Sequence, residues 1–164
     1  MNGIMSFALV STVVIGFAAE AAGQAVTMKL TCQNLGPPAV ESFGAQPGHA
    51  IRETPYSCLV SGGPLDGGVI TAKNWWEMKG TEWTLLTGSG AIRRPEGFAV
   101  YQNMEGKLTV QMKDGKPSGY TASGHGRYLA ASGPAVQLTG KNYNWTVTGT
   151  GPTSFQADIE VTGQ

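Results

Sequence analysis

Charged residues are scarce in this chain. They make up 13% of its 164 residues, against about 25% in an ordinary globular domain, and the 11 basic and 11 acidic side chains form no long run of either sign. Such a chain has no electrostatic attraction to a polyanion or to an anionic membrane surface. We therefore expect no nucleic-acid partner.

Metal-binding side chains are also few. The chain has two cysteines, Cys32 and Cys58, and two histidines, His49 and His125. No CxxC pair occurs and the histidines lie far apart in the sequence, so we predict no metal site. In an oxidising compartment the two cysteines would pair with each other, and closing a loop of this length stabilises a fold by about 3 kcal/mol.

Motifs for nucleotides and for serine hydrolysis are missing as well. Gly124-x-Gly126 begins like GxGxxG, but Leu129 occupies the place of the third glycine and no helical pattern follows. The sequence has no GxSxG nucleophile elbow. We expect neither a nucleotide cradle, nor another cofactor, nor hydrolase chemistry.

Export signals usually begin with a basic residue, and none precedes Lys29 here. Residues 1–25 otherwise have the pattern of an export signal. An apolar stretch from Ile4 to Ala19 is followed by small residues that suit a signal peptidase. We predict a cleaved signal peptide at 1–25 and one domain at 26–164, periplasmic or secreted and without stable membrane insertion. An uncleaved anchor is the alternative, although the apolar stretch is short of the roughly 20 residues that a spanning helix needs.

A 3.6-residue apolar period is absent after the signal, and strand patterns take its place. In "TSFQADIEV" the apolar Phe155, Ala157 and Ile159 alternate with polar residues, which is typical of a half-buried strand. Turn signals separate such segments at 105–107, 114–119 and 132–134. We predict strands at 28–33, 55–61, 68–78, 81–88, 97–103, 107–112, 119–129, 135–140, 143–147 and 155–161.

Proline and glycine are concentrated between the two cysteines, where no period is sustained, so residues 34–54 are predicted to form a long loop. Glycine is abundant throughout, with 24 residues. Gly88, Gly90, Gly124 and Gly126 fall inside strand patterns, where they permit the bending that closes a sheet. The prediction is an all-β fold, a single antiparallel barrel of about eight strands.

Two stretches, "TLLTGSGAIR" and "GHGRYLAASGPAVQLTGKNYNWT", carry a rhythm of G-x-G, an aromatic residue, A-x-G and L-x-G. This rhythm resembles that of small bacterial barrels of the calycin-like group, related in shape to allene oxide cyclase and dirigent proteins. The resemblance covers roughly residues 67–164 and implies an eight-stranded barrel with one end open to a cavity. Such families include cyclases, lipid carriers and proteins of unknown role, so no catalytic residue is transferred.

The stretch "NWWEMKGTEW" is the first candidate for a ligand site. Alternation from Ile70 onward turns Trp76 inward and leaves Trp75 on the other face, with Asn74 in phase with the inward set. A buried asparagine needs hydrogen-bond partners, either in the barrel or on a ligand. Trp76, Trp83 and Asn74 are thus candidate ligand contacts, and ordinary core filling is the alternative for the tryptophans.

A second candidate is "QPGHAIRETPY", in which His49, Arg52, Glu53 and Tyr56 lie close together. Such a loop could cover a barrel mouth and supply acid or base groups. We take His49, Glu53 and Tyr56 as candidate ligand contacts; a solvated loop held by the disulfide is the alternative.

Three functions fit these features. The first is an exported barrel that binds a small, partly apolar or aromatic ligand. The second is a structural or interaction module whose barrel is filled by its own side chains. The third is a cyclase or isomerase acting on a lipid-like substrate, which rests on the resemblance and on His49, Glu53 and Tyr56. The volume and lining of the barrel interior separate them.

Overall fold

The computed structural model describes residues 25–42 and 47–163. The predicted signal peptide at 1–25 falls almost wholly outside them, so its cleavage and the export of the protein stay predictions. Two short 3-10 helices, η1 (Gly63–Leu65) and η2 (Gly133–Leu138), interrupt the strands. The strands are β1 (Thr27–Asn34), β2 (Ala39–Ser42), β3 (His49–Ser61), β4 (Val69–Lys79), β5 (Glu82–Arg94), β6 (Gly97–Lys113), β7 (Lys116–Ala131), β8 (Asn142–Gly149) and β9 (Ser154–Thr162).

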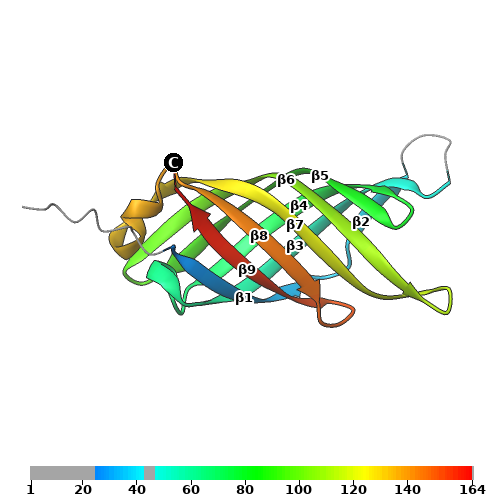
Figure 1. The fold of residues 1–164 in the computed structure, drawn as a ribbon, viewed down its shortest axis with the longest axis horizontal. Helices are drawn as coiled ribbons and strands as arrows, with labels where there is room; N and C mark the ends of the chain where they lie inside the picture. The colour runs from blue at the N-terminus through cyan, green and yellow to red at the C-terminus, as the bar shows by residue number, and fades with distance from the viewer. Residues whose placement is uncertain (1–24, 43–46, 164) are drawn as a thin grey trace, which may run out of the picture.

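Eight of these strands form a closed antiparallel barrel (Figure 1). Their order is β1-β9-β8-β7-β6-β5-β4-β3, and β3 pairs with β1 to close the sheet. The prediction of an all-β barrel of about eight strands is therefore confirmed. Among the described residues, no helix is both long and apolar enough to cross a membrane.

Alternating side chains build the core of the barrel. In β9 Phe155, Ala157 and Ile159 are buried while the residues between them are exposed, as the sequence pattern predicts. In β1 Met28 and Leu30 follow the same rule. Because one face of each strand points inward, the eight strands together enclose an interior lined by apolar and aromatic groups.

The strand that closes the barrel, β3, pairs with two different strands along its length. β1 pairs with residues 56–61 of β3, and β2 pairs with residues 50–53 of the same strand. At the seam Cys32 of β1 lies opposite Cys58 of β3, and the two form a disulfide. The predicted disulfide is thus confirmed, and it joins the first strand of the barrel to the strand that closes it.

The predicted 34–54 loop is wrong over much of its length. Residues 39–42 form β2, and β3 begins at His49, so residues 49–54 lie in a strand. The physical reason is that β3 runs beyond the end of β1 and β2 pairs with the edge left open, which gives this segment backbone partners that its composition does not reveal.

Two other local predictions are also wrong. The expected turn at 105–107 lies inside β6, where a bulge between Asn103 and Glu105 lets the strand continue. The expected strand at 135–140 is largely the 3-10 helix η2, which begins with Gly133 at φ 59° and Pro134. Its buried residues, Ala135 and Leu138, are three apart, which is the period of a 3-10 helix.

The two ends of the barrel differ. The η2 helix, orange in Figure 1, lies at one end, and the β6–β7 and β8–β9 hairpins lie at the other. At the η2 end Leu65 of η1 and Leu138 of η2 are fully buried. The short helices therefore close one end with apolar side chains, and any opening to solvent lies at the hairpin end.

Candidate functional site

The barrel is hollow. It contains a cavity of about 590 Å³, a size typical of small-molecule sites. At the closed end its wall is aliphatic, with Met28, Ile70 and Ile92. At the hairpin end it includes Ser118 and Pro152, both exposed, so the cavity opens there. Its axis thus leads from a solvent-facing mouth to an apolar floor.

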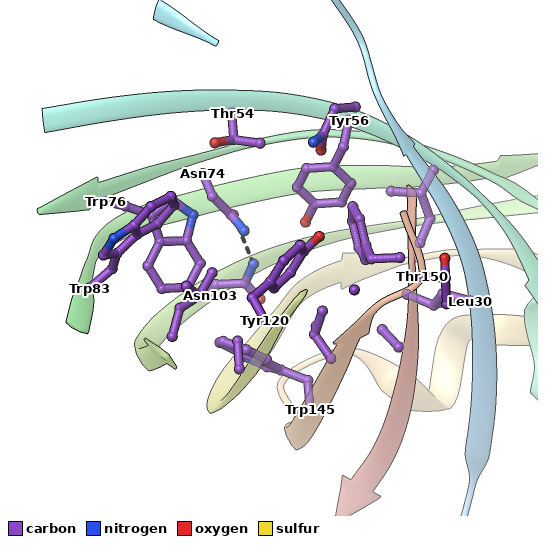
Figure 2. A pocket seen from close by; sticks show the side chains of 18 of the residues that line it. Leu30, Thr54, Tyr56, Asn74, Trp76, Trp83, Asn103, Tyr120, Trp145 and Thr150 are labelled. Atoms are coloured by element: carbon purple, nitrogen blue, oxygen red, sulfur yellow. Dashed lines mark hydrogen bonds between the residues drawn. The ribbon is translucent and has the colours of Figure 1, made fainter. Parts of the chain in front are cut away.

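Aromatic rings supply much of the wall between mouth and floor. The rings of Trp76 and Trp145 meet edge to face across the barrel, with centroids 6.5 Å apart. Figure 2 shows these two side chains, Trp83 and Tyr120 projecting into the cavity from four different strands. Such a wall offers large, rigid contact surfaces to an apolar or aromatic molecule.

Glycines in neighbouring strands make room for the ring of Trp145. A Cβ at Gly106 would lie 2.5 Å from Cζ2 of Trp145, and a Cβ at Gly124 would also collide with this ring. Both glycines lie inside strands, β6 and β7, where they allow the backbone to approach the indole closely. The two glycines therefore shape the cavity by letting the ring lie against the backbone.

A buried polar network crosses the cavity wall. Asn103 is 6% exposed; its Nδ2 donates to Oδ1 of Asn74 at 3.1 Å, drawn dashed in Figure 2, and its Oδ1 accepts from the Tyr143 hydroxyl at 2.7 Å. The hydroxyls of Tyr56 and Tyr101 lie 3.3 Å apart. Burial raises the pKa of Tyr56, Tyr101 and Tyr143, so these phenols are neutral at physiological pH.

Among the described residues that line the cavity, Arg52 is the only one with a formal charge. Its guanidinium lies over the ring of Trp83, 5.0 Å from the ring centroid. Its Nε is buried without a hydrogen-bond partner, and it forms no ion pair in the described part of the chain. Burial lowers the pKa of Arg52, and the nearby Tyr120 acts in the opposite direction.

Two further cavity residues have buried polar atoms without partners in the described structure. They are the indole Nε1 of Trp145, which is a donor, and Oδ1 of Asn34, which is an acceptor. Buried polar atoms without protein partners are rare, and a bound molecule with matching polar groups would satisfy them. All three such atoms, including Nε of Arg52, belong to residues of this one cavity.

The structure brings together four of the six residues that the sequence singles out. Trp76, Trp83, Asn74 and Tyr56 all line the cavity. That they contact a ligand stays a prediction.

The other two residues, His49 and Glu53, do not line the cavity. Nε2 of His49 lies 2.8 Å from Oε1 of Glu77, and Oε1 of Glu53 lies 2.7 Å from Nζ of Lys73. In β3 the inward positions are those of Arg52, Thr54 and Tyr56, so residues 49 and 53 have the opposite phase and lie on the outer face. The expected loop is therefore a strand at these positions, and that His49 and Glu53 contact a ligand stays a prediction.

Sequence reasoning missed several cavity residues that alternation could have revealed. Trp145 lies in phase with Tyr143 and Val147 in "YNWTV", and Asn103 lies in phase with Ala99 and Tyr101. The segment that contains Arg52 lacks such a pattern, and only the pairing of β3 with β4 fixes its phase. Among the described residues, no group of three or more His, Cys, Asp or Glu side chains is placed to hold a metal ion.

Comparisons with known proteins identify the fold. No protein-family model matches the chain, and no curated protein matches it significantly. A crystal structure of a protein with unknown function from Clostridium acetobutylicum ATCC 824 is similar, with 15% identity, a TM-score of 0.65, and coverage of 84% of this chain and 97% of that one. At this identity the likeness shows a shared barrel fold alone.

A solved structure described as pyocyanin demethylase also matches. It is 14% identical, with a TM-score of 0.47, and the match covers 84% of this chain and 100% of that one. At that TM-score it carries no argument about this chain. Together the comparisons support a small β-barrel fold, and they do not confirm the calycin-like group that the sequence resembles.

Proposed function

We propose that this protein is an exported barrel that binds a small, partly apolar ligand in its interior. The observation that carries the proposal is the cavity of about 590 Å³, open at the hairpin end and lined largely by aliphatic and aromatic side chains with a few polar groups. Ligand sites generally combine a concave apolar wall with a few placed polar groups. A disulfide is typical of proteins in oxidising compartments outside the cytosol, which supports export.

The cavity favours this function over an interaction module with a solid barrel. Small eight-stranded barrels can be filled by their own side chains. Here the barrel keeps a cavity of about 590 Å³ that its own side chains do not fill, although the ring of Trp145 occupies the space beside Gly106 and Gly124. An apolar molecule entering the barrel would bury its surface at roughly 25 cal/mol per Å², before the costs of association are subtracted.

The lining also favours binding over cyclase or isomerase chemistry. Among the described residues that line the cavity there is no Asp, Glu, His, Lys or free Cys side chain. Tyrosine is already neutral near pH 7, and burial raises the pKa of Tyr56, Tyr101 and Tyr143 further, so these side chains are poor general bases. His49 and Glu53, which motivated catalysis, lie on the outer face, where His49 is within hydrogen-bond distance of Glu77 and Glu53 pairs with Lys73.

A neutral fluorescent probe, N-phenyl-1-naphthylamine, tests the proposal. Its emission should rise saturably as it enters the cavity of the mature protein. Trp76→Ala should weaken binding about threefold to tenfold, because an aromatic contact is lost. The matched variant Trp75→Ala should change it little, because Trp75 points away from the cavity and lies near Nζ of Lys73.

Two results would contradict the proposal. One is the absence of a saturable response from a folded protein, which would favour an interaction module. The other is an equal effect of the two tryptophan substitutions, which would place the probe outside the barrel.

A further inference from the structure

Arg52 is placed near the mouth of the cavity. β3 runs from His49 at the hairpin end to Ser61 at the end closed by η1 and η2, so Arg52 precedes Tyr56 on the way in. Across the sheet it pairs with Trp76 of β4, and its guanidinium lies over Trp83 of β5. The floor residues Met28, Ile70 and Ile92 lie at the ends of their strands near the short helices. The cavity therefore has a cationic upper part and an apolar lower part.

The cation at this site lacks a counter-ion in the described chain. Of the acidic side chains on its own strand and on the strands paired with it, Glu53 and Glu77 lie beside Lys73 and His49 on the outer face, and Glu41 of β2 forms no ion pair with Arg52. Nε of Arg52 is buried without an acceptor, and burial disfavours the charged form of its side chain. Arg52 as a whole is half-buried, but a buried donor without an acceptor is costly, and an anionic oxygen at hydrogen-bond distance would offset that cost.

We infer that the ligand is an amphiphile with a ring-containing apolar body and a singly charged oxyanion, and that the oxyanion binds Arg52 at the mouth. This inference rests on the proposed function and adds the charge and orientation of the ligand. The planar guanidinium matches a carboxylate or sulfonate, and its stacking on Trp83 holds the fork in place. The apolar body then extends past Trp76 and Trp145 toward the floor.

A matched pair of probes tests the inference. N-phenyl-1-naphthylamine is neutral, and 8-anilinonaphthalene-1-sulfonate has the same ring system with one sulfonate. The variant Arg52→Met keeps an unbranched aliphatic stem and removes the charged guanidinium. In this variant the Kd of the sulfonate probe should rise about tenfold or more relative to that of the neutral probe. A second pair, 2-naphthoate and its neutral carboxamide, asks by competition whether a carboxylate behaves like a sulfonate.

The control variant is Arg94→Met, which changes the net charge equally. Arg94 lies at the closed end and pairs with Glu96, so it should leave the ratio of the two Kd values unchanged. Should Arg52→Met fail to fold, Arg52→Gln is measured in its place with the same expectation.

Outcomes separate the two claims. If the neutral probe binds and Arg52→Met changes both Kd values by the same factor, or neither, the inference is overturned while the proposed function stands. If Arg94→Met changes the ratio as much as Arg52→Met does, the change reflects the net charge of the protein and not an oxyanion bound at Arg52, and the inference is overturned. If neither probe binds the folded protein, the proposed function fails and the inference fails with it.

Discussion

Cys32 and Cys58 are registered partners on β1 and β3, and their disulfide spans the seam at which the barrel closes. Both side chains are buried, 1% and 3% exposed, so the bond lies inside the barrel wall. The pairing partners of β1 are β9, near the end of the chain, and β3. The disulfide therefore restrains a closure that otherwise depends on contacts distant in sequence.

Replacing both cysteines, in Cys32→Ala/Cys58→Ala, should lower the free energy of unfolding by about 3 kcal/mol, because the unfolded chain regains the entropy of an open loop. Denaturant titration measures this difference. Reductant should lower the stability of the wild type to that of the variant and leave the variant unchanged. Equal stability of variant and oxidised wild type would contradict the account.

Gly124→Ala should lower the free energy of unfolding by about 1–3 kcal/mol. The new Cβ would collide with the backbone oxygen of Glu105 and with the ring of Trp145, and a well-packed wall accommodates extra atoms poorly. Gly163→Ala is the control, because nothing lies within 4 Å of a Cβ there. A thermal or denaturant unfolding curve for Gly124→Ala that overlays the wild type would show that the ring does not pack against β7.

Asn103→Ala should lower the free energy of unfolding by about 1–3 kcal/mol, because it leaves Oδ1 of Asn74 and the hydroxyl of Tyr143 with fewer partners in a buried site. The matched control is Asn144→Ala on the exposed face of β8, which should change stability by less than about 0.5 kcal/mol. Denaturant unfolding compares the two. Equal effects would mean that the Asn74–Asn103–Tyr143 network contributes nothing beyond an exposed amide.

The buried tyrosines predict how stability depends on pH. Burial raises the pKa of Tyr56, Tyr101, Tyr128 and Tyr143 above their value of about 10 in the unfolded chain. Above about pH 10 the unfolded chain loses protons that the folded barrel keeps, so the free energy of unfolding falls as pH rises. Below that pH this contribution is fully present.

Phenolate absorbance followed together with far-ultraviolet circular dichroism tests the titration. The absorbance of the four buried tyrosines should appear only as the barrel unfolds, whereas the protein in denaturant should titrate near pH 10. Titration of all tyrosines near pH 10 in a barrel that keeps its dichroism would contradict their burial.

Short-range patterns predicted much of the fold. Alternation in "TSFQADIEV" and "YNWTV" marked β9 and β8, and its phase in β4 put Trp76 and Asn74 inside. The first part of β3 was not predictable in this way. "HAIRET" has no apolar alternation, because one of its inward residues is Arg52. That this segment forms a strand follows from its pairing with β2 and β4.

The cavity was harder to predict than the strands. Its free space depends on which glycines face which rings, and the register between β6, β7 and β8 sets that relation. The sequence shows Gly106 as a turn residue, whereas in the barrel it gives room to Trp145 from a neighbouring part of the sheet. Such information lies in long-range pairing, which a local pattern does not contain.

The most direct test of a ligand-binding interior is the position of a bound probe. Intermolecular nuclear Overhauser effects should connect N-phenyl-1-naphthylamine to the methyl groups of Leu108 and Ile159, which line the cavity. They should be absent for Leu59 and Val69, which are 54% and 49% exposed. Contacts to the inner methyls alone would place the ligand in the barrel as proposed; contacts to the exposed methyls alone would contradict that claim.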